Sequence, residues 1–176
     1  MDSLLYFHPE YMSLSSPHPL WTTAGSSPTM VTMASVQSVM LSGRYRTEGL
    51  CSHWSNNPNG YCKSSSSCNT FEDITHILQH CSALDNTRER LSAFTSSNCE
   101  DKPELKLIVD TFCSPQRRHF CQFLLDFSVL PEVVKSVQLH GQEFLHHLFN
   151  ITRMWCFALH RDRLKIHGRW SIFKQH

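Results

Sequence analysis

Three cysteines and two histidines lie within 21 residues, in the segment YCKSSSSCNTFEDITHILQHC at positions 61–81. Thiolates and imidazoles are ligands that zinc prefers, and a structural zinc site places four of them around one ion. Cys62, Cys68, His76 and Cys81 supply such a set, with five, seven and four residues between consecutive members. This spacing predicts a closed, structural Zn²⁺ site that joins a loop to the start of a helix.

Two features of the spacing leave the choice of ligands open. Zinc sites usually have two to four residues between the first pair of ligands, whereas five are present here. His76 and Cys81 are five residues apart, about 140° around an ideal helix, so the helix must loosen or end near Cys81. His80, Cys51 and His53 are also within reach. In the metal-free alternative, Cys81 is part of an apolar helix face and the other thiols are ordinary loop residues.

The elements that must position these residues are predicted to be helical. Thr70 followed by Asp73 resembles a capping box, which places a helix start near Thr70. Apolar residues then repeat along one stripe of that helix. The members of the stripe are Phe71, Ile74, Leu78, Cys81, Leu84 and Leu91.

The rest of the chain also has helical patterns, and no useful strand-like alternation occurs. Residues 1–32 are rich in Ser, Pro and Thr, which predicts a disordered leader. The fold class expected is mainly α: a small zinc-knuckle-like module at 33–94, followed by an irregular helical bundle with a basic tail at 95–176. The predicted further helices are a short one after Met33 that ends at Gly43, Glu104–Phe112, Gln116–Leu130, one opened by Pro131, and Phe144–Leu164 after a break at Gly141.

Charge is unevenly distributed along the chain. The formal net charge is +1, but residues 153–176 carry six Lys/Arg against one acid, Asp162. Cations neutralise phosphates and aromatic rings stack on bases, so the tail could contact RNA or DNA. The candidate contact residues are Arg161, Arg163, Lys165, Arg169 and Trp170.

The eight cysteines do not indicate a secreted, disulfide-bonded protein. The first residues lack a basic region followed by a long apolar run, so no secretory signal is evident. We therefore expect an intracellular protein with reduced thiols, in nucleus or cytoplasm. No apolar run is long enough for a membrane span.

Several of these motifs occur in an order typical of one family. The segments MLSGRYRTEGLCSHWS at 40–55, GYC at 60–62 and EDITHILQHCSALDNTRERL at 72–91 resemble the C-terminal segment of non-LTR (LINE-like) retrotransposon reverse transcriptase polyproteins. The resemblance covers about 36–91. It implies that Cys62, Cys68, His76 and Cys81 bind zinc as a Cys-Cys-His-Cys knuckle, and that the module contacts RNA or DNA.

The sequence lacks the residues for the catalytic steps of such an element. A reverse transcriptase holds two divalent ions with carboxylates, usually around an adjacent Asp pair, and no such pair occurs. We therefore expect a non-enzymatic zinc-binding protein. The alternatives are a metal-independent helical protein-interaction module and a decayed element fragment without function. Oligomeric state is not predicted.

Overall fold

The chain folds into a bundle of helices around one long helix near its C-terminus. A computed structural model of the protein describes residues 18–168, while 1–17 and 169–176 lie outside the described residues. Within 18–168 no β-strand forms, and Tyr61 and Phe71 make a single antiparallel bridge. The predicted mainly α fold is therefore confirmed. The α-helices are α1 (Pro19–Thr22), α2 (Pro28–Leu41), α3 (Glu48–Cys51), α4 (Asp85–Asn98), α5 (Pro103–Phe112), α6 (Phe120–Asp126), α7 (Pro131–His140) and α8 (Gln142–Ile166).

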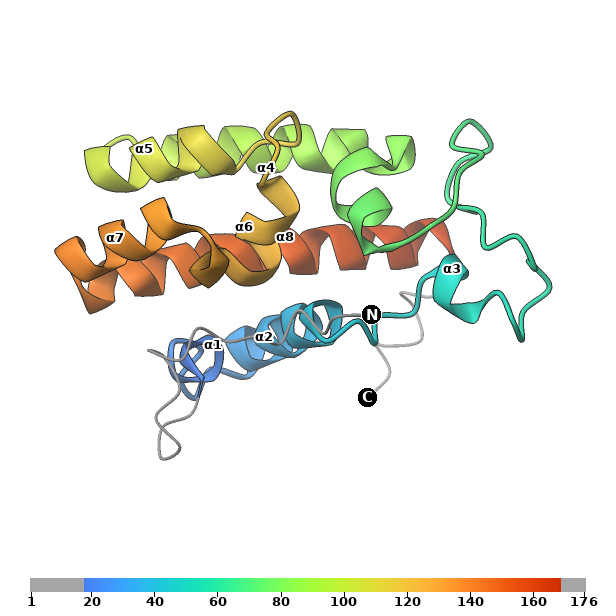
Figure 1. Cartoon of the computed structure of the whole chain (residues 1–176), viewed down its shortest axis with the longest axis horizontal. Coiled ribbons are helices and arrows are strands. Elements are labelled where there is room, and N and C mark those ends of the chain that lie inside the picture. Colours follow the sequence, from blue (N-terminus) through green and yellow to red (C-terminus); the bar gives the residue numbers. More distant parts are fainter. Residues whose placement is uncertain (1–17, 169–176) are drawn as a thin grey trace.

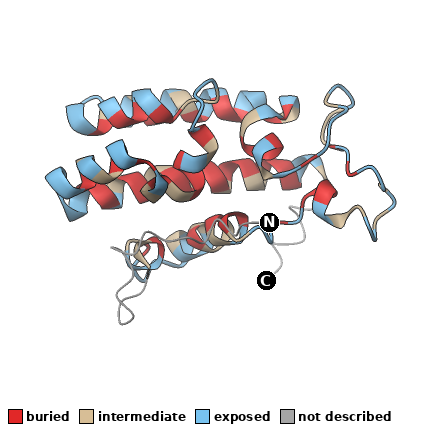
Figure 2. Ribbon diagram, in the orientation of Figure 1, coloured by how far each residue is buried: buried red, intermediate tan, exposed pale blue. Residues whose placement is uncertain are grey.

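Helix α8 runs through the middle of the molecule, with α2 on one side and α4 and α5 on the other (Figure 1). Its buried face is lined by large side chains, of which Trp155 is fully buried. The Trp155 ring meets Phe120 edge to face at 5.4 Å, and its indole N–H donates to Thr95 at 2.9 Å. Buried residues accordingly lie on the helix faces that point toward α8 (Figure 2).

Helix boundaries follow the predicted glycine and proline signals in most places. α5 and α7 begin at Pro103 and Pro131, where the missing N–H costs no helical hydrogen bond. Gly141 separates α7 from α8 with φ +84°. The predicted helix over 116–130 is shorter, because α6 starts only at Phe120.

Two other boundaries differ from the prediction. Residues 18–32 contain α1 and the start of α2, so the helical part begins well inside the predicted leader. The helix predicted from Thr70 begins only at Ile74, because 70–72 pair with an extended segment. Phe71, assigned to the apolar stripe, is instead 52% exposed.

The predicted segments 33–94 and 95–176 share one hydrophobic core. Leu41, Cys62 and Leu78 from the first segment join Phe123 and Trp155 from the second in a single buried cluster. Within 18–168, no helix has the combination of length and apolar character needed to cross a bilayer.

Candidate metal centre

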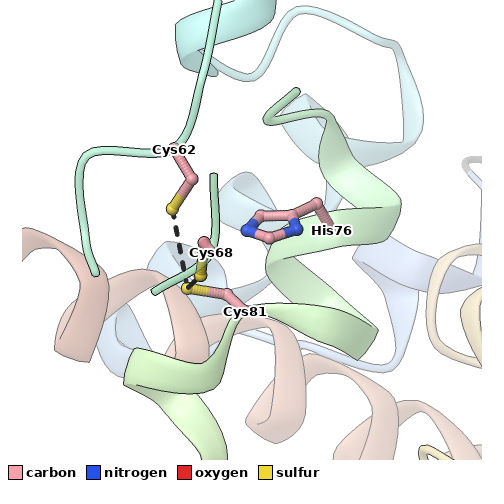
Figure 3. Close-up of side chains that lie close together, drawn as sticks. All are labelled: Cys62, Cys68, His76 and Cys81. Carbon is pink, nitrogen blue, oxygen red and sulfur yellow. Dashed lines mark hydrogen bonds between the residues drawn. The ribbon is translucent and has the colours of Figure 1, made fainter. Parts of the chain in front are cut away.

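The four predicted ligands converge in space. Their ligand atoms all lie within 4.8 Å of one another, and Figure 3 shows the side chains turned toward a common point. The Cys81 sulfur lies 3.8 Å from that of Cys62 and 3.9 Å from that of Cys68. A tetrahedral zinc ion with Zn–S bonds of about 2.3 Å separates its sulfurs by about 3.8 Å. This Cys₃His cluster could therefore hold a metal ion.

The cysteine sulfurs are too far apart for disulfide bonds. A disulfide needs an S–S distance of about 2.05 Å, and all eight cysteines are free. The structure therefore agrees with the expectation of reduced thiols.

A short backbone ladder places Cys62 beside the rest of the cluster. The Cys62 N–H donates to the Thr70 carbonyl at 2.9 Å, and the Glu72 N–H donates to the Gly60 carbonyl at 2.8 Å. Gly60 adopts φ +67°, a left-handed conformation that suits glycine. The ladder folds the five-residue spacer into a loop and returns the chain toward His76.

Serine hydroxyls hold that loop and steady the thiols. Ser65 and Ser67 bond each other at 2.7 Å, and Ser67 bonds Ser82 at 3.1 Å. Ser82 also lies 3.4 Å from the Cys68 sulfur. The serine-rich spacer is therefore tied to the residue that follows Cys81.

A π-helical turn solves the spacing problem between His76 and Cys81. Residues His76–His80 form this turn, and the Cys81 N–H donates to the His76 carbonyl at 2.7 Å. An i→i+5 bond puts an extra residue into the turn, so Cys81 returns over His76 where an α-helix would leave them apart. The expectation that the helix must loosen or end near Cys81 is confirmed.

Asp73 and Arg88 hold the two ends of this turn. The Asp73 carboxylate accepts the His76 N–H at 2.7 Å, so Asp73 serves as the cap that the sequence suggested for Thr70. The Arg88 guanidinium donates to three carbonyls, those of Ile77, Leu78 and Cys81, at 2.7 to 2.9 Å. Without Arg88 the buried Ile77 and Leu78 carbonyls would lose their donor, whereas the Cys81 carbonyl also accepts the Leu84 N–H at 3.1 Å.

The His76 ring is prepared to bind through one nitrogen. Its Nδ1 lies 3.4 Å from the Thr70 hydroxyl, whereas its Nε2 is buried and has no hydrogen-bond partner. Metal-bound histidines typically donate their second N–H to a neighbouring acceptor, which fixes the ring. A buried, unpartnered Nε2 beside three thiols is what a metal ion would satisfy.

Burial keeps most of the cluster neutral when no cation is bound. Burial raises the pKa of Cys81 to about 12, with the nearby Cys62 adding to the rise. Burial likewise raises the pKa of Cys62 and lowers that of His76. Burial would also raise the pKa of Cys68, but hydrogen bonds from Ser82 outweigh it and the net pKa is lowered. A divalent cation would replace the thiol protons and stabilise the thiolates.

The other potential ligands lie outside the cluster. Cys51, His53 and His80 are not among the grouped residues of the described chain, and His53 and His80 are exposed. Sequence patterns did not single out Arg88, although it occupies the stripe position between Leu84 and Leu91. Because Arg88 lies in line with apolar residues of the helix, its position in the sequence already indicates a buried arginine.

The predicted nucleic-acid residues do not form one free surface. Arg163 is buried and donates to the Glu72 carboxylate at 2.6 Å, so it is not available to a phosphate. Arg161 and Lys165 lie 3.0 and 3.6 Å from Asp162, which reduces their net charge. Arg169 and Trp170 lie outside the described residues.

Comparison of the chain with protein-family models, curated proteins and solved structures gives no significant match. The Cys₃His cluster and its supporting contacts are therefore the main structural guide to function.

Proposed function

We propose that this chain is a non-catalytic zinc-binding protein that contacts RNA or DNA, related to the terminal segment of a retrotransposon polyprotein. The observation that carries the zinc assignment is the 3.8 to 3.9 Å spacing of the sulfurs around Cys81, next to the unpartnered Nε2 of His76. The nucleic-acid assignment is supported by the order of motifs over 40–91.

The four ligands would give zinc a structural role. Three thiolates and one imidazole complete a tetrahedral shell and leave no position for a substrate water. Zinc bound there would crosslink the 62–68 loop to the turn that carries His76 and Cys81. The free energy of metal binding would then stabilise a loop that has few apolar contacts of its own.

Metal analysis of the purified, reduced protein tests the zinc assignment. We expect one equivalent of zinc in the natural chain and a large loss in Cys62→Ala and His76→Ala variants. Cys51→Ala is the matched control, because its thiol lies outside the cluster. Full zinc content in both ligand variants would refute the assignment.

Chelation separates this proposal from a metal-independent interaction module. A zinc-dependent module should lose helicity locally and lose affinity for single-stranded RNA or DNA when zinc is removed. A protein that keeps its helicity and its binding properties after chelation would instead be the helical interaction module.

A further inference from the structure

A groove lies between the C-terminal ends of α2 and α8. Its volume is about 530 Å³, and its walls are formed by Val36 and Val39 of α2 and by His160 and Leu164 of α8. Arg44 and Arg46 also line it. Both helices end on the side of the molecule that carries α3 and the metal-ligand loop (Figure 1).

The end of α2 fixes the backbone from which the two arginines project. Gly43 has φ +71°, and its N–H donates to the Met40 carbonyl at 3.2 Å. The Arg44 N–H donates to the Val39 carbonyl at 3.2 Å, which completes a Schellman motif. The chain then continues into Tyr45, which is buried and anchors the segment between Arg44 and Arg46.

Tyr45, His160 and Arg163 line the groove, and Arg163 connects it to Glu72 behind the groove wall. Glu72 accepts from Arg163, whose guanidinium carbon lies 5.6 Å from the centre of the Tyr45 ring. The Tyr45 hydroxyl lies 2.8 Å from Nδ1 of His160. Glu72 directly follows Phe71, which forms the backbone bridge beside the metal-ligand cluster. The groove is therefore joined to the segment that carries the metal ligands.

Arg44 and Arg46 are exposed and have no ion-pair partner within the described chain. Most other described cations are already next to a carboxylate. These are Lys63, Arg88, Arg90, Lys102, Lys106, Arg161, Arg163 and Lys165. No Asp or Glu lines the groove, so its unbalanced charge is positive.

We infer that this groove is the contact site for single-stranded nucleic acid, with phosphates at Arg44 and Arg46 and a base against Val36, Val39 and Leu164. This inference rests on the proposed function. The groove shares His160 and Leu164 with the predicted basic segment 153–176, but the phosphate contacts are assigned to Arg44 and Arg46. The volume is that of a site for a compact ligand, of about 300 to 1,000 Å³. A protein partner usually covers a wider face, about 800 Å² per side, so a nucleotide fits the groove better. Ser35 and His160 also line the groove, with the Ser35 hydroxyl donating to the Val31 carbonyl and Nδ1 of His160 bonded to Tyr45.

Binding of a labelled oligouridine of about 12 nucleotides to the zinc-loaded full chain tests the site. Affinity is measured by fluorescence anisotropy as salt rises from about 0.05 to about 0.3 M. Each phosphate contact to a single strand contributes about 0.7 to the slope of log affinity against log salt. The Arg44→Gln/Arg46→Gln variant should therefore lower that slope by about 1.4. If the affinities converge at about 1 M salt, the loss at about 0.1 M is about 25-fold.

The matched control is Arg117→Gln/Arg118→Gln, which removes two adjacent exposed arginines outside the groove. It should change neither slope nor affinity by a comparable amount. Val39→Glu is the second variant, because Val39 is 42% exposed and we expect the chain to fold with a carboxylate there. Its carboxylate should weaken binding by repelling phosphate. Zinc content and thermal unfolding of each variant verify that it is folded.

The outcomes separate this inference from the proposed function. Loss of slope and affinity in both groove variants, but not in the control, supports the site. Zinc-dependent binding that is unchanged in both groove variants overturns the site and leaves the proposed function standing. An absence of oligonucleotide binding by the natural chain overturns the site together with the nucleic-acid half of the proposed function. Groove-dependent binding of an acidic amphipathic peptide, without oligouridine binding, also overturns it and identifies a protein-docking groove.

Discussion

The Arg163 guanidinium and the Glu72 carboxylate form a buried ion pair, at 2.6 Å, between residues 91 positions apart. Glu72 also accepts the Glu48 N–H at 2.8 Å. The carboxylate thus joins α3, the segment before His76 and the central helix α8. Metal centre and bundle are connected through this pair.

Removal of one partner of the pair should be strongly destabilising. Glu72→Gln or Arg163→Met leaves an unmatched buried charge or donor set, and we expect a loss of about 3–5 kcal/mol in the free energy of unfolding. The double variant should lose less than the sum of the two single variants, because neither charge is then left alone. Urea unfolding of the four proteins in a double-mutant cycle measures this; strict additivity would contradict direct pairing.

Arg88 should be necessary for the π-helical turn. Arg88→Met removes the guanidinium donors to the carbonyls of Ile77, Leu78 and Cys81. The Cys81 carbonyl keeps the Leu84 N–H, and each of the other two buried acceptors left unpaired costs about 1–3 kcal/mol. We expect a destabilisation of about 3 kcal/mol or more and faster zinc transfer to a chelator. Arg90→Met is the matched control, because the Arg90 side chain is 73% exposed. Its cost should be below about 1 kcal/mol. Equal behaviour of the two variants would argue against the capping role.

Gly49 should not accept a larger residue. A Cβ at this position would lie 2.4 Å from the Phe71 ring and 2.6 Å from the Glu72 carbonyl oxygen. Gly49→Ala should therefore cost about 1–3 kcal/mol by overpacking. Adding Phe71→Ala should restore only part of the stability, since the backbone contact remains. Thermal unfolding of the zinc-loaded proteins provides the comparison, and a neutral Gly49→Ala would contradict the packing.

Stability should fall in acid because of His160. Burial lowers the pKa of His160 to about 4, and the Arg163 charge adds to the effect. An unfolded histidine titrates near pH 6.5, so between about 6.5 and 4 the unfolded chain binds the proton and the native one does not. The neutral form contributes its full stability above about pH 6.5, and this contribution is lost as the pH falls toward 4.

The matched variant for this titration is His160→Gln, which keeps a polar partner for Tyr45 but cannot take up the proton. The free energy of unfolding of the natural chain should fall by about 1 kcal/mol per pH unit more than that of the variant in this window. The full 1.4 kcal/mol is not expected because the ring is partly exposed. Metal loss affects both proteins and cancels in the difference. Parallel pH profiles would contradict a half-buried, neutral His160.

Features that depend on neighbouring residues could be predicted from the sequence, whereas features that depend on contacts between distant residues could not. Pro131, Gly141 and the apolar spacing along α8 depend on neighbouring residues, so these boundaries could be read from the sequence. The metal ligands at 62–81 lie close together in the sequence, so they could also be identified from it. The five-residue separation of His76 and Cys81 does not fit an α-helix, which predicts a loosened turn. Arg163 was misassigned because its role is decided by Glu72, far away in the chain. The helix start near Thr70 failed because the backbone at 70–72 pairs with 60–62 instead.

Zinc K-edge X-ray absorption of the purified, reduced chain tests the central claim most directly. We predict one zinc per chain with three sulfur ligands at about 2.3 Å and one nitrogen ligand at about 2.0–2.1 Å. In Cys68→Ala one sulfur should disappear from the shell, whereas Cys51→Ala should leave it unchanged. A shell of oxygen and nitrogen ligands, or a sulfur count that does not respond to Cys68, would contradict the Cys₃His site.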